Sequence, residues 1–373
     1  MKQGWIPILL TALTLTALPA RASEGRIPVW EPTVITQPGH YVLTRDLTVP
    51  AGVIPIQIRT GGVTVDLNGH VLESAGITEP VILISGADTG VTVVHNGEIR
   101  GGLHGIHALS GGLQRRLFCR DLRISHPFSH GILVESTDDV ELLRIVIGGG
   151  QVGIELLNAA GATGTAHISY PGEWCPTQSS CSPAIRVRGV TTLIEGGILE
   201  PLPDGGIPAI ELIDAPRSII RNVVVGFRPD PGGAGATGPV IRLQNSPGVL
   251  IADNTIHGNG SDGSNGIFVD DTSDRVKIIN NVITSCGNDG IQVLSEGSFI
   301  VDNLVGGNGG AGIFVGGSNN LVQGNKAGEN TGVGIHFETP GHVYRDNVLL
   351  GNTGGATGGK GEADVTDGGG NIP

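Results

Sequence analysis

Four charged residues that alternate in sign recur along the chain at intervals of 31, 25 and 31 residues: Glu155, Arg186, Glu211 and Arg242. Carboxylates can hydrogen-bond to sugar hydroxyls or transfer protons, and arginines can hold a carboxylate through two hydrogen bonds. With two neighbours on the same predicted face they form a candidate substrate-binding surface, the charged column: Glu135, Glu155, Arg186, Arg188, Glu211 and Arg242. The alternative is a structural ladder, because exposed opposite charges solubilise a flat sheet and stabilise it by about 0–1 kcal/mol per pair.

Proton transfer on this surface would need an acid or base, and four residues are candidates. Glu155 and Glu211 belong to the charged column, whereas His167 and Tyr170 stand at the root of a long loop that precedes Arg186. Trp174 follows in that loop and could stack on a sugar ring as a further substrate-binding residue, or could cover its own loop.

The same loop contains Cys175 and Cys181, six residues apart, which predict a loop-closing disulfide in an oxidising compartment. Two free thiols are the alternative. Cys119 and Cys286 have no obvious mate, and we expect them to be small buried fillers.

Histidines and turn acids are the remaining candidates for metal or acid/base chemistry. His104 and His130 each precede an apolar triplet by two residues and should stack, which suits either a base or polar turn residues. The chain shows no CxxC pair and no His-rich tract, so we predict no metal site and no cofactor. Asp138-Asp139 and Asp270-Asp271 could bind Ca²⁺ weakly, although solvated turns explain them equally well.

A repeated apolar-x-apolar triplet supplies the elements that would position these side chains. Strand side chains alternate between faces, so the first and third members point inward and the middle member outward. Intervals of 22 to 31 residues fit one such strand per turn, or rung, of a parallel solenoid, and the Leu-x-x-Leu-x-Leu pattern of a leucine-rich repeat is absent. The twelve triplets begin at Ile56, Ile82, Ile106, Ile132, Ile154, Ile185, Ile210, Ile241, Ile267, Ile291, Ile313 and Ile335.

A second apolar strand follows each triplet and ends near an asparagine in many repeats. Stacked at one position, these amides would hydrogen-bond along the solenoid. The expected ladder is Asn222, Asn254, Asn281, Asn303, Asn325 and Asn347.

The run Gly39–Leu47, followed by Val63–His70, resembles the opening of bacterial secreted right-handed parallel β-helix repeat proteins of the pectin-lyase-like superfamily. The resemblance extends over roughly Gly39 to Asn347 and implies an all-β fold, a single-stranded right-handed parallel β-helix (solenoid) of about twelve rungs. Pectate and alginate lyases, uronate epimerases and non-enzymatic binding proteins share this fold, so it does not imply one activity.

The N-terminus predicts export. Lys2, an apolar run and Ala20-Arg21-Ala22 describe a signal peptide over residues 1–22. We expect an N-terminal segment and cap at 23–55, the β-helix at 56–350 and a Gly-rich tail at 351–373.

The net charge and the distribution of apolar residues limit the classes of partner that we expect. A formal net charge of −13 disfavours nucleic acid, and no later segment could cross a membrane as a helix. We therefore expect a monomer that is secreted, periplasmic or at the cell surface and that binds a polysaccharide. Lyase- or epimerase-like modification of a uronate-containing glycan is one hypothesis, and a non-catalytic accessory solenoid is the other.

Overall fold

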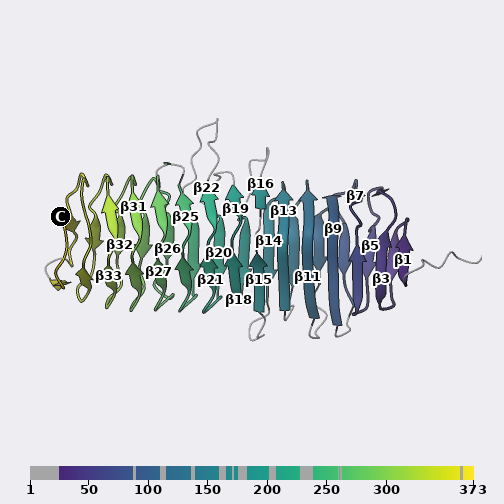
Figure 1. Ribbon diagram of the computed structural model, residues 1–373, viewed down its shortest axis with the longest axis horizontal. Coiled ribbons are helices and arrows are strands. Elements are labelled where there is room, and N and C mark those ends of the chain that lie inside the picture. Colours follow the sequence, from purple (N-terminus) through teal and green to yellow (C-terminus); the bar gives the residue numbers. More distant parts are fainter. Residues whose placement is uncertain are drawn as a thin grey trace, which may run out of the picture.

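The molecule is a rod of parallel β-strands that stack along its long axis (Figure 1). It is seen in a computed structural model. For Arg115, Ser169 and residues 172–174 the structure describes the backbone alone. The described residues are 25–86, 90–109, 115–135, 139–158, 165–169, 172–174, 183–200, 207–226, 238–258, 260, 263–361 and 364–373.

One sheet, the triplet sheet, has fourteen strands in sequence order, and all their pairings are parallel. The twelve predicted isoleucine triplets form its central strands, with every first isoleucine aligned to the next. Its strands are β2 (Thr33–Ile35), β5 (Ile56–Ile58), β8 (Ile82–Ile84), β10 (His104–Ala108), β12 (His130–Glu135), β14 (Val152–Leu157), β17 (Ile185–Arg188), β20 (Ile210–Ile213), β23 (Ile241–Gln244), β26 (Ile267–Val269), β29 (Ile291–Val293), β32 (Ile313–Val315), β35 (Ile335–Phe337) and β37 (Thr357–Gly358).

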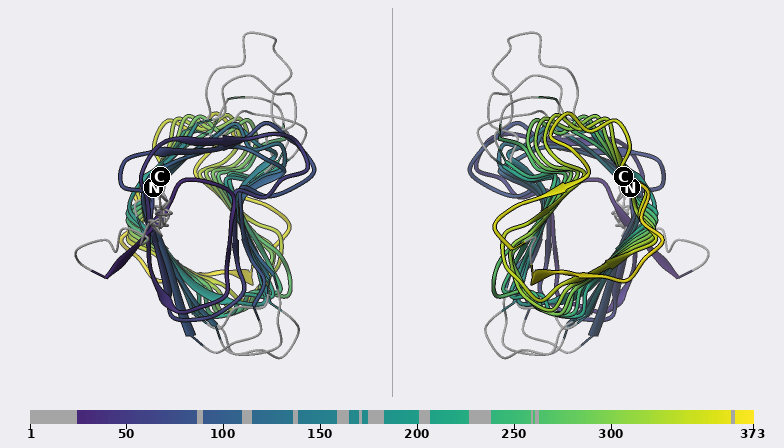
Figure 2. Two further views of the ribbon diagram at one scale, coloured as in Figure 1. Left: turned by 90° about the vertical axis from the view of Figure 1, so that its right-hand side faces the viewer. Right: turned by 90° about the vertical axis from the view of Figure 1, so that its left-hand side faces the viewer.

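The other sheet, the larger sheet, has twenty-four strands, and in many rungs two of them follow one triplet strand. Figure 2 shows the chain winding around a central core when the rod is viewed from its ends. These strands are β1 (Arg26–Val29), β3 (Gly39–Leu43), β4 (Leu47–Val49), β6 (Val63–Asp66), β7 (Val71–Ser74), β9 (Gly90–Gly101), β11 (Arg115–Ser125), β13 (Asp139–Gly148), β15 (Thr165–Ser169), β16 (Gly172–Trp174), β18 (Thr191–Glu195), β19 (Ile198–Glu200), β21 (Ile219–Arg221), β22 (Val224–Gly226), β24 (Leu250–Ala252), β25 (Thr255–His257), β27 (Lys277–Ile279), β28 (Val282–Thr284), β30 (Phe299–Val301), β31 (Leu304–Gly306), β33 (Leu321–Gln323), β34 (Lys326–Gly328), β36 (Val343–Arg345) and β38 (Thr366–Asp367).

The core is a continuous apolar column inside the rod. The first and third members of all twelve triplets are buried, from Ile56 and Ile58 to Ile335 and Phe337. Cys119 and Cys286 are free thiols buried in the same core, which confirms them as apolar fillers. The predicted register of the triplets is therefore confirmed.

An asparagine ladder runs inside the rod, as expected, but Asn222 is not part of it. Asn254 donates to Asn281, and the series continues through Asn303, Asn325 and Asn347 to Asn371. Asn222 instead has φ of +55° and lies at the bend, where asparagine tolerates the left-handed region. Val223 takes the ladder position, and its backbone N–H donates to the amide oxygen of Asn254.

Both ends of the rod continue the sheets. At the N-terminal end, β1 pairs with β3 and β2 pairs with β5. At the C-terminal end the Gly-rich tail adds β37 next to β35 and β38 next to β36. The part of the chain that the structure describes contains no helix of the length and apolarity that a bilayer crossing needs.

Candidate functional site

The middle residues of successive triplet strands line up on the outward face of the triplet sheet. Strand pairing places Glu155 beside Arg186, Arg186 beside Glu211 and Glu211 beside Arg242. The expected alternation of charge therefore exists in space. The two glutamates depart from the expectation of exposed charges, since Glu155 is 8% exposed and Glu211 7%. Long neighbouring side chains on both flanking strands cover them.

Glu155 is held from both sides of its strand. Its Oε2 atom lies 2.6 Å from Nε2 of His130, and its Oε1 atom accepts a hydrogen bond of 3.4 Å from Nη1 of Arg186. Burial by itself raises the pKa of Glu155, but the hydrogen bond to His130 and the charge of Arg186 outweigh it and hold the pKa below its usual value. Glu155 is thus an ionised carboxylate at neutral pH.

The three arginines of the charged column differ in how firmly they are bound. Nε of Arg186 donates to Oε2 of Glu211 at 2.8 Å, so this arginine bridges two buried carboxylates. Arg188 and Arg242 approach Glu155 and Glu211 at 3.9 Å, beyond hydrogen-bond distance. Their side chains are 47% and 40% exposed, compared with 21% for Arg186. The loosely held arginines are therefore the groups available to an anionic ligand.

Histidines extend the charged column toward the N-terminal end of the rod. His104 and His130 are aligned on adjacent strands, as expected, with ring centroids 5.0 Å apart and ring planes tilted by 55°. His107 lies 3.3 Å from Glu135. His104 and His130 are not turn residues, because each begins a strand, β10 and β12. Burial, followed by the charges of His107 and His130, lowers the pKa of His104 to about 3, so this ring is neutral.

Ser129, His130 and Glu155 form a hydrogen-bonded series that sequence reasoning missed. The Ser129 hydroxyl lies 2.8 Å from Nδ1 of His130, whose Nε2 atom contacts Glu155. An ionised carboxylate accepts but cannot donate, so a neutral His130 ring beside Glu155 carries its proton on Nε2 and turns the lone pair of Nδ1 toward the hydroxyl. A hydroxyl, an imidazole and an orienting carboxylate in this order can transfer a proton. The available signal was the Ser-His-Gly sequence before the triplet at Ile132, one rung from Glu155.

One predicted site residue, His167, is not brought to the charged column. His167 lies on β15 of the larger sheet, where it contacts Glu195 at 2.9 Å, because its strand belongs to a different side of the rung. Tyr170 lies outside the described residues, and so does the side chain of Trp174, of which β16 shows the backbone. Cys175 and Cys181 also lie outside them, and their disulfide stays a prediction.

Two of the predicted turn acids, Asp270 and Asp139, accept hydrogen bonds from neighbouring protein groups. Asp270 accepts hydrogen bonds from the hydroxyls of Thr272 and Ser273 and from the backbone N–H of Asn245. Asp139 accepts from the hydroxyl of Thr165 at 2.7 Å, and Asp138 lies outside the described residues. These contacts are those of carboxylates that stabilise turns and strand ends.

Comparison with known proteins agrees with the geometry. Residues 209–366 match the family model described as a right handed beta helix region. The protein is a right-handed parallel β-helix. A search of curated proteins finds no significant match.

Solved structures share this β-helix fold at low identity. The A-module of a mannuronan C-5 epimerase from Azotobacter vinelandii is 12% identical with a TM-score of 0.53, over 90% of this chain and 91% of that one. A periplasmic alginate epimerase (12% identity, TM-score 0.40, 86% and 74% covered) and an alginate lyase from Paenibacillus sp. str. FPU-7 (12%, 0.37, 86% and 92%) are less similar. At 12% identity the likeness to the A-module concerns the fold alone, and the activity has to be argued from the site.

Proposed function

We propose that this protein is exported and binds an anionic, uronate-containing polysaccharide along the charged column, where it modifies the polymer by lyase- or epimerase-type chemistry. The observation that carries the proposal is the combination of Arg188 and Arg242, partly exposed and loosely paired, with a proton-transfer series at His130 and Glu155. Both kinds of group lie along the neighbouring strands β12 to β23.

The arginines supply recognition. A guanidinium that is not hydrogen-bonded to a protein carboxylate can bind a uronate carboxylate with two parallel hydrogen bonds. The Arg242 side chain is 40% exposed, and its Nη1 atom lies 3.9 Å from Glu211, so this guanidinium is not held by a hydrogen bond to that carboxylate. Phe268, one strand further, lies with its ring centroid 6.0 Å from Arg242 and adds an aromatic surface of the kind that packs on sugar rings.

The histidine supplies chemistry. Removal of the C5 proton of a uronate requires a base, and the developing negative charge on the carboxylate requires nearby cations. His130, oriented by Glu155 and facing Ser129, is our candidate for the acid/base group. Return of the proton to the opposite face would give epimerisation, whereas loss of the C4 substituent would give a lyase product.

Binding and turnover can be measured separately. The first probes are mannuronan and oligomannuronates, chosen because the A-module of like fold is by name a mannuronan C-5 epimerase. Affinity is measured by calorimetry, lyase activity by the absorbance of unsaturated uronate, and epimerisation by solvent-deuterium incorporation at C5. An array of other uronate polymers follows if mannuronan does not bind.

The variants give opposite expectations for the two roles. Arg188→Ala and Arg242→Ala should each weaken binding about fivefold or more, as expected of an arginine in a groove. His130→Gln should abolish turnover and keep binding. Arg123→Ala is the matched control, because Arg123 is 65% exposed on the larger sheet. A bound glycan whose affinity ignores both arginine substitutions would refute this site.

A non-catalytic accessory solenoid is the second candidate, and one observation favours it. Every carboxylate of the charged column already contacts a histidine or an arginine: Glu135 with His107, Glu155 with His130, Glu211 with Arg186. A saturated network can serve as a rigid, neutralised binding face. Glycan binding without turnover, sensitive to Arg188 and Arg242 but not to His130, would select this alternative.

A further inference from the structure

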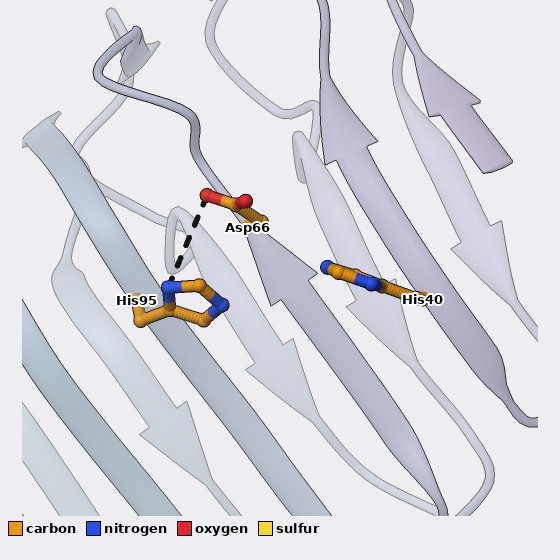
Figure 3. Close-up of side chains that lie close together, drawn as sticks. All are labelled: His40, Asp66 and His95. Carbon is orange, nitrogen blue, oxygen red and sulfur yellow. Dashed lines mark ion pairs between the residues drawn. The ribbon is translucent and has the colours of Figure 1, made fainter. Parts of the chain in front are cut away.

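Three side chains with metal-ligating atoms converge on the outward face of the larger sheet, near the N-terminal end of the rod. His40 lies on β3, Asp66 on β6 and His95 on β9, three strands that pair in sequence. One ligand atom from each lies within 4.8 Å of the others. Figure 3 shows the two imidazole rings flanking the carboxylate.

Strand pairing explains why the three side chains meet. Asp66 is aligned with His95 on the next strand, while His40 is aligned with Thr64, two residues before Asp66. Alternate residues of a strand share a face, so His40 and Asp66 are diagonal neighbours. Residues 26 and 29 positions apart in the sequence thus become adjacent in space.

The carboxylate is fixed in place by its surroundings. Oδ1 of Asp66 accepts hydrogen bonds from the backbone N–H of Asn68 at 2.8 Å and from the amide of Asn96 at 3.0 Å. The Asp66 side chain is 10% exposed and that of His95 16%. Such outer hydrogen bonds are typical of carboxylates that ligate metals, because they set the orientation of the ligand.

The three side chains do not satisfy one another's hydrogen-bonding capacity. Nδ1 of His95 lies 3.9 Å from Oδ1 of Asp66, too far for a hydrogen bond. Nε2 of His40 is buried and has no hydrogen-bond partner among the described residues. By contrast His70 and Asp46, on the same part of the rod, form an ordinary pair at 3.1 Å.

We propose that His40, Asp66 and His95 bind one divalent transition-metal ion of the Zn²⁺ class. Two imidazole nitrogens and one carboxylate oxygen suit a borderline cation better than Ca²⁺ or Mg²⁺, which prefer oxygen ligands. Zinc–nitrogen bonds of about 2.1 Å set ligand atoms about 3.4 Å apart in a tetrahedron, so modest side-chain rotation closes the site. Three protein ligands leave one position for water or for an oxygen of a bound molecule.

This site is separate from the charged column. It lies on the larger sheet, while the charged column lies on the triplet sheet, so either proposal can fail without the other. The histidines beside the charged column already have carboxylate partners, since His107 contacts Glu135 and His130 contacts Glu155.

The test is zinc binding by the whole exported protein after treatment with a chelator. Calorimetric titration with ZnCl₂ and native mass spectrometry should find one Zn²⁺ per chain that raises the melting temperature. His40→Gln, His95→Gln and Asp66→Asn should each weaken binding about tenfold or more, since loss even of outer-shell partners costs that much. His70→Gln is the control, because it removes a histidine of the other histidine–aspartate pair and should leave binding unchanged.

Circular dichroism verifies that each variant is folded before titration. If the Asp66→Asn protein does not fold, the two histidine variants decide, because neither ring is fully buried. Co²⁺ in place of Zn²⁺ gives a second readout, since its visible spectrum reports tetrahedral nitrogen and oxygen coordination. No Zn²⁺ bound by the wild-type protein, or binding that both His40→Gln and His95→Gln leave intact, would overturn the proposal.

Discussion

Arg186 should be the residue of the charged column on which stability depends most. It bridges Glu155 at 3.4 Å and Glu211 at 2.8 Å, and both carboxylates are about nine-tenths buried. Breaking a buried pair costs about 3–5 kcal/mol when a charge is left uncompensated, but here His130 and Arg242 stay beside the two carboxylates, so we expect about 2–3 kcal/mol for Arg186→Met. Methionine keeps most of the side-chain volume, so the loss reports charge rather than packing.

The assay is urea unfolding followed by circular dichroism, with Arg188→Met as the matched control. Arg188 is 47% exposed and 3.9 Å from its carboxylate, so its removal should cost about 0–1 kcal/mol. Adding Glu155→Gln and Glu211→Gln to Arg186→Met should recover part of the loss, because the uncompensated charges disappear. Equal effects of the Arg186 and Arg188 substitutions would refute the reasoning, and the charged column would then be an exposed surface ladder.

Three further predictions concern His104, the asparagine ladder and the Cys175–Cys181 disulfide. His104 is neutral in the folded protein because its pKa lies near 3, whereas in the unfolded chain it gains a proton below about pH 6.5. The free energy of unfolding should therefore fall by up to about 2 kcal/mol between pH 6.5 and pH 5. In urea unfolding at several pH values, His104→Gln should remove most of this pH dependence. Asn303→Ala removes a buried member of the asparagine ladder and should lower the free energy of unfolding by about 2–3 kcal/mol. Asn222→Gly, at an exposed position in the left-handed region, is the control and should change it little in the same assay. Mass mapping of exported protein should find Cys175 linked to Cys181, and free thiols at both positions would contradict the disulfide.

The register of the triplet sheet could be predicted from the sequence because one physical rule determines it. Alternation along a strand fixes which side chains point inward, and the interval between isoleucines fixes which strand comes next. The sign alternation of Glu155, Arg186, Glu211 and Arg242 follows from the same rule, and strand pairing confirms it.

Burial and bends were harder to predict. Glu155 and Glu211 are outward-facing yet buried, because His130 and arginine side chains from the flanking strands contact them. The sequence pattern predicts Asn222 in the ladder because asparagines stand near the same position in other rungs, but Asn222 occupies the bend position one residue before the ladder. Whether an asparagine lies at the bend or in the ladder depends on its backbone φ angle. Residue type does not specify that angle, because asparagine suits both positions.

The metal-ligand set shows why a search for short motifs misses sites in a solenoid. Familiar metal motifs place their ligands a few residues apart, whereas His40, Asp66 and His95 are separated by about one rung each. Adjacent rungs are only about 4.8 Å apart in space, so residues one rung apart are nearer than residues two apart on one strand. His130 and Glu155 likewise come from adjacent rungs, although strand pairing aligns His130 with Val152 and the two side chains meet along the strands. In this protein, chemistry on either sheet is therefore to be sought among residues one rung apart, and the glycan and metal proposals both rest on that single geometric rule.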